Sequence, residues 1–388
     1  ATKAAIRDVG RVLGFRYGFV EKIYRILPME EEATLKKVID NDINFLSKFN
    51  FEKDVLIVIN LSIMIEGMIR NIGKHAGGIV ISPFDLVNFM PVCYDVGEVY
   101  PLSQLDKEDL ESVGLLKFDF LGLKTLTIVY SGMIDVNLKR LKCNKLEIDI
   151  DNLPLDDTKT FLLLQKFITS AIFQLESCSM KELIKRLKPN NFEEIIDLVA
   201  LIRPGPMQSG MADDFICRKF GLQDVSYPHD LLKPILEKSN GMILYQEQVM
   251  QIAQVLSGYT LIEADLLRRA ISKKNLLEMH MYKQSFISGA AKNGVSEDLS
   301  SYIFDLIDKF SGYGFNKSHS AAYSLLTYQT AWMKSHYPLE FMSSVLSVDI
   351  ASGDKIIHYV EDCYKMGLKI VCPNINKSLR RFHVDNYD

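Results

Sequence analysis

The spacing of apolar residues predicts helices in the first part of the chain. Apolar residues recur three and four positions apart from Thr34 to Phe49, and again from Val55 to Ile69. This is the period of one face of a helix. We therefore expect residues 1–72 to form a small, mostly helical unit.

After Gly73 the pattern changes to that of strands. HAGGIVISP, FMPVCYDV and VGLLKFDFLGL are short apolar runs bounded by glycine, proline or aspartate, an arrangement typical of strands joined by turns. The helical period returns between Thr125 and Lys142, and helices are expected from there to Pro338, with breaks at RPGP and SGYGFNKSHS. The tail from Ile370 contains a strand-like RRFHV segment. These elements predict an α+β fold that is mostly helical.

Composition narrows the class of protein. A length of 388 residues predicts two or three domains, since domains usually run to roughly 100 to 200 residues. No apolar run reaches the ~18 residues of a membrane span, so we expect a soluble protein. The six cysteines show no CxxC spacing and the first residues show no signal-peptide core, which favours a reducing cytosol and no zinc site. A net charge of −4 leaves nucleic acid open, because a groove needs only local positive charge.

The KFDF segment is the first candidate site. Strand alternation puts Lys117 and Asp119 on one face and Phe118 and Phe120 on the other. If the phenylalanines face the core, Asp119 is placed to hold a divalent metal and Lys117 to contact a phosphate. The alternative is an ordinary Lys–Asp pair on a half-exposed strand.

A second candidate is the basic run in LIEADLLRRAISKKNLLEM. Arg268, Arg269, Lys273 and Lys274 place four positive charges within seven residues, and Arg269 and Lys273 share a helix face. Arginine forks and lysine ammonium groups suit a polyphosphate ligand. A solvated basic face is the alternative.

The third candidate is the break at SGYGFNKSHS. Its polar residues directly precede a new helix, where Ser318 or Ser320 is a candidate N-cap. Free amide groups at a helix start favour phosphate, and neighbouring tyrosines favour base stacking. The alternative is a capped loop between two helices. The residues concerned are Tyr313, Asn316, Lys317, Ser318, His319 and Tyr323.

Other polar positions carry weaker signals. Arg203 precedes a Pro-Gly-Pro turn that would aim its side chain rigidly, although such turns are as often architectural. His75 is interpreted as a packed or capping histidine, since no metal-ligand partner lies at the usual spacing. Asp149 and Asp151 mimic a paired metal-binding motif, but Pro154 and two further aspartates follow them. A solvated loop is the better interpretation there.

The ordered set of motifs resembles one protein family. HAGGIVIS, VGLLKFDFLGLKTLTIV, FQLES, LVALIRPGPMQSGM, ILYQEQVMQIAQVLSGYTL, DLLRRA and GYGFNKSHSAAY follow one another in the chain. In this order they resemble the bacterial DNA polymerase III alpha subunits, and more the DnaE-type than the PolC-type branch. The resemblance runs nearly from residue 1 to residue 388.

The resemblance implies a chemistry for these residues. The family's palm is similar to the nucleotidyltransferase fold of polymerase beta, and three aspartates there hold two magnesium ions. Asp119 matches the third aspartate and Lys117 a palm lysine near the triphosphate. The other two aspartates form a D-x-D motif in a region ahead of this sequence, so we expect this chain, as given, to be a fragment cut at both ends and unable to polymerise DNA.

The family also implies domains and partners. Residues 1–72 resemble the thumb, 73–133 the C-terminal part of the palm and 134–388 a truncated fingers domain. The implied nucleotide-binding residues are Arg268, Arg269, Lys273, Lys274, Asn316, Lys317, Ser318 and His319, and the implied DNA-binding residues are Arg203 and Tyr313. Implied ligands and partners are primer-template DNA, dNTPs, two Mg²⁺ ions, a sliding clamp, a clamp loader and a proofreading subunit. A cytoplasmic, nucleoid-associated replisome protein is expected, with no membrane contact.

Two functions other than that of a part of a DNA polymerase stay open. One is a binding module that holds DNA or nucleotide without chemistry, which the missing D-x-D motif favours. The other is a different nucleotidyltransferase that completes its metal site with Asp149 and Asp151. The family's usual RRAMGKKKPEEM also reads RRAISKKNLLEM here, a departure that would alter the phosphate grip.

Overall fold

The structure of the protein is a computed structural model. It describes residues 2–26, 34–36, 39, 53–69, 73–95, 97, 99–273, 276–310 and 314–385, apart from the side chains of 2–3, 24–26, 204, 208, 272–273, 276–277 and 309–310. The chain divides into two compact units, residues 1–122 and 123–388. The expected boundary after residue 133 falls inside a helix of the second unit, and the three-domain division stays a prediction.

Helices pack around a small core in the first half of unit 1. They are α1 (Thr2–Val12), α2 (Tyr17–Ile26) and α4 (Lys53–Ile65), and Ile6, Val58 and Ile59 are buried between them. The expected helix over Val55–Ile69 is confirmed but ends at Ile65, because a turn with Gly67 at φ 85° follows. Most of the other expected helix, Thr34–Phe49, lies outside the described residues.

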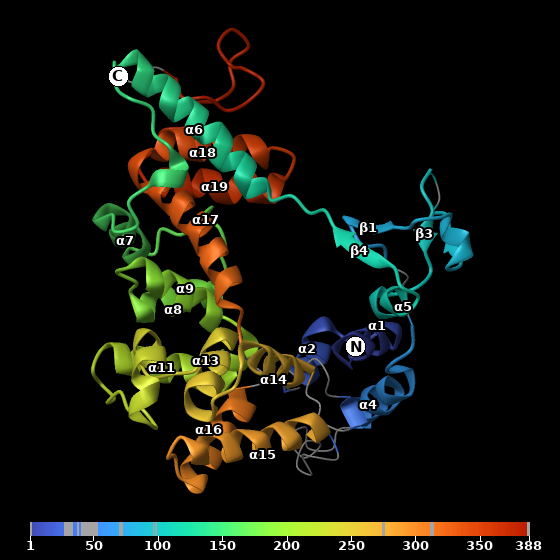
Figure 1. The fold of residues 1–388 in the computed structure, drawn as a ribbon. Helices are drawn as coiled ribbons and strands as arrows, with labels where there is room; N and C mark the ends of the chain where they lie inside the picture. Colours follow the sequence, from blue (N-terminus) through green and yellow to red (C-terminus); the bar gives the residue numbers. More distant parts are fainter. Residues whose placement is uncertain are drawn as a thin grey trace. The chain divides into compact units, whose positions relative to one another are not determined.

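The second half of unit 1 contains two small antiparallel sheets (Figure 1). In one, β1 (Gly78–Ile81) pairs with β4 (Leu116–Asp119), and in the other β2 (Val92–Cys93) pairs with β3 (Leu102–Ser103). A short 3-10 helix, η2 (Leu86–Asn88), and α5 (Lys107–Ser112) lie between them in sequence. The three predicted strand segments are therefore confirmed.

The faces of the β1–β4 sheet are not covered as expected. Phe118 is 42% and Phe120 66% exposed, so the phenylalanines do not face a core of described residues. Val80, the cross-strand partner of Lys117, lies on the same face as Lys117 and packs against the core that contains Leu110 and Leu115. A core this small covers one face of the sheet only, and it is the face that carries Lys117 and Asp119.

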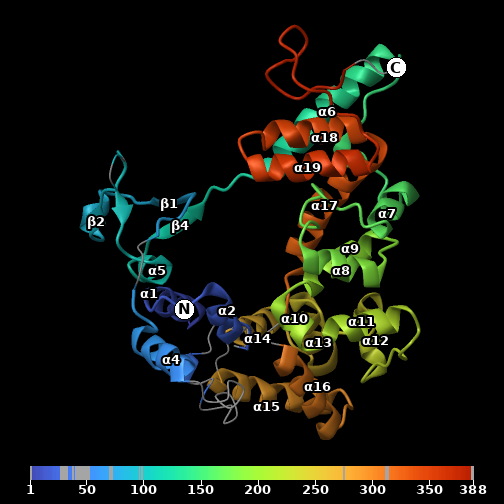
Figure 2. The same cartoon turned by 180° about the vertical axis from the view of Figure 1, so that it is seen from behind.

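Unit 2 is built from helices (Figures 1 and 2). It begins with α6 (Lys124–Lys142), which confirms the helix expected over 125–142. The elements that follow are η3 (Ile150–Asn152), α7 (Thr158–Gln165), α8 (Cys178–Leu187), α9 (Phe192–Leu201), α10 (Pro204–Gln208), α11 (Met211–Lys219), η4 (Asp230–Leu232), α12 (Lys233–Leu236), η5 (Glu237–Ser239), α13 (Gln246–Ser257), α14 (Leu261–Lys273), α15 (Leu276–Lys292), α16 (Glu297–Phe310), α17 (Lys317–His336), α18 (Pro338–Val348) and α19 (Gly353–Lys365).

Two hydrophobic cores hold these helices together. The larger core surrounds α17, where Tyr328, Ala331 and Met333 are fully buried against α6, α7, α9 and α18. The second core lies among α13, α14, α15 and α16, with Ile252 and Phe286 fully buried. α17 thus extends from one group of helices toward the other (Figure 2).

Three local expectations were wrong. The helices do break before RPGP, since α9 ends at Leu201, but Pro-Gly-Pro opens α10 instead of forming a turn, because proline fits the first helical position after Arg203. RRFHV is no strand within the described residues; Phe382 packs against the larger core, and its carbonyl accepts a hydrogen bond from Ser347 instead of from a neighbouring strand. The N-cap of α17 is Asn316, not Ser318 or Ser320, since the helix already begins at Lys317.

Candidate functional site

Asp119 lies beside two basic groups of unit 1. Lys117 Nζ is 2.8 Å and His75 Nδ1 3.8 Å from its Oδ1. The hydrogen bond from Lys117 lowers the pKa of the half-exposed Asp119 carboxyl, which therefore stays ionised. The predicted Lys–Asp face is confirmed, whereas His75 is a neighbour that sequence spacing missed, because it reaches Asp119 across the pairing of β1 with β4.

Two glycines let β1 and the residues before it approach β4 closely. The amide of Phe120 donates to the carbonyl of Gly77 at 2.7 Å, and a Cβ on Gly77 would overlap the Phe120 carbonyl oxygen. A Cβ on Gly78 would crowd Lys117 and the His75 ring. His75 Nδ1 also accepts from the Gly77 amide at 3.2 Å, which fits the capping interpretation.

Within the described residues of unit 1, the carboxylates needed for a two-metal site are not together. Among the described residues, no group of three or more histidine, cysteine, aspartate or glutamate side chains is arranged to hold a metal. Asp119 offers oxygen ligands that suit Mg²⁺, but two ions require several carboxylates. The residues described thus fit one edge of such a site.

In unit 2, an acidic side chain holds the paired arginines of α14. Asp265 Oδ1 accepts from Arg268 Nε at 2.9 Å, and its Oδ2 accepts from Arg269 Nε at 2.8 Å. These bonds lower the pKa of Asp265, so the carboxylate stays charged. Of the other predicted cluster members, Lys274 lies outside the described residues, as does the side chain of Lys273.

The start of α13 connects Arg268 to the segment before α17. Gln246 Oε1 lies 3.4 Å from Arg268 Nη1. The Gln246 amide donates to the Phe315 carbonyl at 2.9 Å, and the Phe315 amide donates to the Leu244 carbonyl at 3.2 Å. A short parallel bridge thus fixes Phe315 beside Tyr245, although the two residues are 70 positions apart in sequence.

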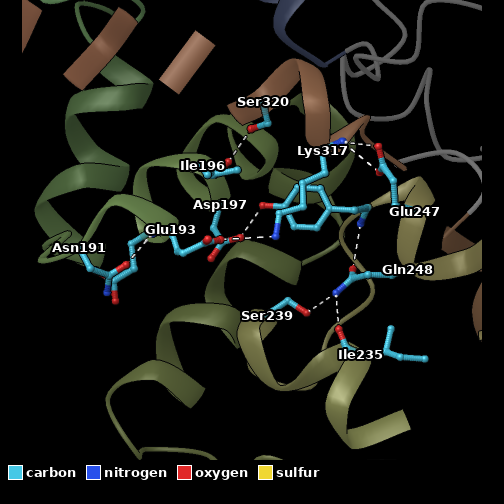
Figure 3. A network of polar contacts seen from close by, with 12 residues as sticks. Asn191, Glu193, Ile196, Asp197, Ile235, Ser239, Glu247, Gln248, Lys317 and Ser320 are labelled. Atoms are coloured by element: carbon cyan, nitrogen blue, oxygen red, sulfur yellow. Dashed lines mark hydrogen bonds and ion pairs between the residues drawn. The ribbon is translucent and has the colours of Figure 1, made fainter. Parts of the chain in front are cut away.

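The first turn of α17 is held by two side chains. Asn316 accepts from the His319 amide at 2.7 Å. Both carboxylate oxygens of Glu247 accept from the Lys317 amide, each at 3.0 Å (Figure 3). The backbone of the first turn of α17 is therefore held in place, while the side chains of Asn316, Ser318 and His319 are exposed.

Behind this turn lies a buried acidic pair (Figure 3). The Tyr245 hydroxyl donates a short hydrogen bond to Asp197 Oδ1, and burial raises the pKa of Asp197 from 3.8 to about 7. Burial and the neighbouring carboxylate also raise the pKa of Tyr245. Sequence reasoning missed this pair, since its members stand 48 positions apart in different motifs.

The Lys317 ammonium points toward this buried pair. It lies 3.4 Å from Glu193 and 5.3 Å from the Tyr245 ring centroid. These groups line a cavity of about 240 Å³, bounded also by Ser239 and Gln248. In this structure the Lys317 side chain thus neutralises carboxylates within the protein, while only its backbone takes part in the helix start.

Arg203 lies at the same segment. Its guanidinium carbon is 4.4 Å from the Phe315 ring centroid, a cation–π distance, and burial lowers the pKa of this arginine. The structure therefore places Arg203 and His319 against the Phe315 ring, and Gln246 links Arg268 to the Phe315 backbone. Asp119 belongs to unit 1, and Tyr313 lies outside the described residues.

Asp149 and Asp151 are exposed, as predicted, but the segment forms the start of the 3-10 helix η3 and not a loop. Asp149 caps the 3-10 helix η3 through the amide of Asp151 at 3.0 Å and also accepts from Asn152. Asp151 lies 3.3 Å from the Gln329 amide nitrogen. Both carboxylates thus serve local structure, which argues against the alternative metal site.

Known proteins resemble the chain over both units. Residues 1–122 match the family model described as the bacterial DNA polymerase III alpha NTPase domain, and residues 130–294 match its finger domain. DNA polymerase III subunit alpha of Buchnera aphidicola subsp. Schizaphis graminum is 52% identical over 389 residues, and that of Escherichia coli K12 51% over 391. These alignments cover 99% and 100% of the chain but 34% of each relative. The chain thus spans about a third of their length.

Proposed function

Because the chain belongs to the bacterial DNA polymerase III alpha subunit family, we propose that it forms part of the catalytic subunit of a replicative DNA polymerase. The intact subunit would extend a primer 5′ to 3′ from dNTPs on a DNA template. The observation that carries this proposal is the arrangement around Phe315, where two arginines and a capped helix start meet.

The paired arginines are proposed to grip the incoming triphosphate. Asp265 accepts hydrogen bonds from the Nε groups of Arg268 and Arg269. These bonds fix the direction in which each guanidinium points. Arg269 is 64% exposed, so its terminal nitrogens are open to water. Arginine forks bind phosphate oxygens through paired charge-assisted hydrogen bonds, and Lys273 and Lys274 would add positive charge to the same run.

The base side of the nucleotide is proposed to lie at the start of α17. Asn316, Ser318 and His319 present exposed polar side chains there. Glu247 and Asn316 hold the backbone in place, so the backbone that carries these side chains does not have to be ordered when a nucleotide binds. The Lys317 ammonium would bind a phosphate only after its ion pair with Glu193 is broken.

Asp119 is proposed to be the metal-binding carboxylate of this chain, with Lys117 beside it. Bound Mg²⁺ would activate the primer hydroxyl and neutralise charge on the phosphate. Lys117 holds Asp119 ionised, which keeps its oxygens available as ligands. The D-x-D pair of the family would supply the remaining carboxylates in the intact subunit.

The three-domain division is proposed from the resemblance. Residues 1–72 would form the thumb, residues 73–133 part of the palm, and residues 134–388 much of the fingers. In the cell the intact subunit would work in the cytoplasm at the nucleoid, with a sliding clamp, a clamp loader and a proofreading subunit. Within the described part of the chain, no helix is long and apolar enough to cross a bilayer.

Nucleotide binding tests the proposed phosphate grip. We expect Arg268→Ala/Arg269→Ala to weaken the binding of Mg²⁺–dNTP to the chain by at least about tenfold, since a charge-assisted hydrogen bond contributes roughly 1.5–3 kcal/mol. Titration calorimetry measures the change. The matched control is Lys185→Ala/Arg186→Ala on α8, which also removes two exposed charges. An equal loss of dNTP affinity in both double variants would mean that the arginines attract the nucleotide only through their general charge, and the proposed specific binding of the triphosphate would be wrong.

Primer extension separates a polymerase part from a binding module. With a single matching aspartate, the chain by itself is expected to bind labelled primer-template and dNTP in Mg²⁺ without extending the primer. With that result, the isolated chain would act as a module that binds DNA and nucleotide without chemistry. Extension that Asp119→Ala abolishes would mean that other carboxylates of this chain complete the metal site, and the proposed inactivity would be wrong.

A further inference from the structure

The Lys317 side chain turns inward from an exposed helix start. The residues on either side of it are exposed, but its ammonium lies 3.4 Å from Glu193 Oε2 and lines the acidic cavity of about 240 Å³ (Figure 3). Among the described residues that line this cavity, the carboxylates are those of Glu193, Asp197 and Glu247. Both oxygens of Glu247 already accept from the Lys317 amide. Glu193 and Asp197 are therefore the carboxylates that attract the ammonium.

Glu193 and Asp197 differ in their contact with water. They are four positions apart on α9 and therefore share one helix face. The Glu193 side chain is 51% exposed, whereas Asp197 is 4% exposed. Water screens the charge of the first carboxylate far more than that of the second, so an ionised Asp197 requires a cation beside it. Burial raises the pKa of Asp197 to about 7, and this requirement thus arises near neutral pH.

The surroundings of Asp197 identify Lys317 as that cation. The charged and titratable groups that act on Asp197 or line its cavity are Glu193, Glu194, Lys238, Tyr245, Glu247 and Lys317. Glu194 is paired with Lys219 of α11 at 2.8 Å, and Lys238 is exposed to water. The charge of Lys317, whose side chain is 35% exposed, lowers the pKa of Asp197. This attraction is mutual, so the ionised carboxylate draws the Lys317 ammonium into the cavity.

We propose that Asp197 is a positioning residue that acts through Lys317. In its ionised form Asp197 keeps the ammonium in the cavity, and after taking up a proton from solvent it releases the ammonium toward a phosphate at the start of α17. Release costs less when Asp197 is neutral, because Lys317 then gives up its screened ion pair with Glu193 and no attraction to a buried charge. The inference rests on the proposed function, since the phosphate is that of the nucleotide, and it adds a proton-linked control of that site.

Chemical labelling of Lys317 tests this attraction without a nucleotide. An acetylating reagent reacts with accessible, uncharged lysine amines, and peptide mass spectrometry gives the rate at Lys317 relative to that at exposed Lys185 on α8 of the same whole chain. In the wild type this ratio is expected to fall by about fivefold between pH 6 and pH 8, as the buried charge appears. In Asp197→Asn the ratio is expected to stay within about twofold, because only the pair with half-exposed Glu193 remains.

Tyr245→Phe separates positioning from a structural role. The ring stays in place, but the hydroxyl that stabilises the ionised form of Asp197 is lost. The fall in Lys317 labelling is therefore expected at a higher pH than in the wild type, a shift that a purely structural carboxyl would not produce. Asp224→Asn, at an exposed position, is the matched control and is expected to keep the wild-type profile.

Nucleotide binding tests the release of Lys317. Titration calorimetry with Mg²⁺–dNTP is expected to give similar affinities for the wild type and Asp197→Asn at pH 6. At pH 8 the wild type is expected to bind about fivefold more weakly than the variant, because its Lys317 is kept in the cavity. Both proteins meet the same ligand, so titration of the nucleotide phosphates cancels in this comparison.

The outcomes distinguish this control from the function on which it rests. A labelling ratio that is constant with pH in the wild type, or that falls equally in Asp197→Asn, would overturn the proposal. Equal dNTP affinities of the two proteins at pH 8 would also overturn it, because Lys317 would then not be released to the ligand. If neither protein bound dNTP while labelling changed as expected, the proposed nucleotide site would be wrong and the attraction between Asp197 and Lys317 would still be supported.

Discussion

Asp197→Asn is expected to raise the free energy of unfolding of unit 2 above pH 7 and to change it little near pH 4. The pKa of this buried carboxyl rises from 3.8 to about 7 on folding. The folded chain therefore binds a proton that the unfolded chain has lost, and this stabilising contribution disappears as the pH rises through about 7. The amide keeps a hydrogen-bond acceptor for Tyr245 and carries no charge. The difference reaches about 2–4 kcal/mol at pH 8.

Urea unfolding at pH 4 and pH 8 measures this difference. Trp332, the single tryptophan, is 7% exposed in the larger core of unit 2, so its fluorescence reports on the unit that contains Asp197. The control is Asp224→Asn, at an exposed position, which is expected to alter the free energy of unfolding little at either pH. A gain in Asp197→Asn that is the same at both pH values would show that this carboxyl does not titrate near neutrality.

Gly77→Ala is expected to break the pairing of β1 with β4. The added methyl group would overlap the carbonyl oxygen of Phe120, and a backbone atom cannot move aside as the end of a side chain can. Overpacking of this kind destabilises by about 1–3 kcal/mol. Hydrogen exchange measures the effect at the Phe120 amide, which donates to Gly77. Exchange there should become roughly 10- to 100-fold faster.

Gly122→Ala is the matched control for this substitution. No heavy atom lies within 4 Å of a Cβ built on Gly122, and the residue belongs to the same unit. The Phe120 amide should therefore exchange as in the wild type. If Gly77→Ala also left this exchange unchanged, the close approach of the two strands would not be what places Asp119 beside Lys117 and His75.

Much of the architecture could be predicted from local pattern. The strand around Lys117 and Asp119 and the helices α6 and α14 follow from periodicity and charge spacing, because each depends mainly on neighbouring residues. The helix that became α17 was predicted, but it begins at Lys317, earlier than expected, and its cap is Asn316. A cap is defined by the first residue of a helix, and Asn316, Ser318 and Ser320 are all able to cap.

The rest of the candidate site depends on contacts between distant segments. Tyr245, which directly precedes α13, reaches Asp197 on α9 only in the folded unit 2, and no spacing in the sequence indicates that partnership. The same holds for Glu247, which finds the amide of Lys317 seventy positions away. At RPGP the local sequence itself is ambiguous, because its prolines fit equally into a turn and into the first turn of a helix.

The length of α17 links binding to the interior of the protein. It spans 20 residues, about 30 Å at 1.5 Å per residue. Its last turns are buried, where the Lys334 ammonium donates to the Ser170 carbonyl at 2.6 Å and the Tyr328 hydroxyl to the Pro154 carbonyl at 2.6 Å. The buried last turns thus fix the position of the whole helix. The orientation of its first turn, which faces the proposed ligand, therefore depends on contacts at the other end. Substitutions in the core around the end of α17 would therefore shift its first turn and change ligand binding, although they lie far from any ligand.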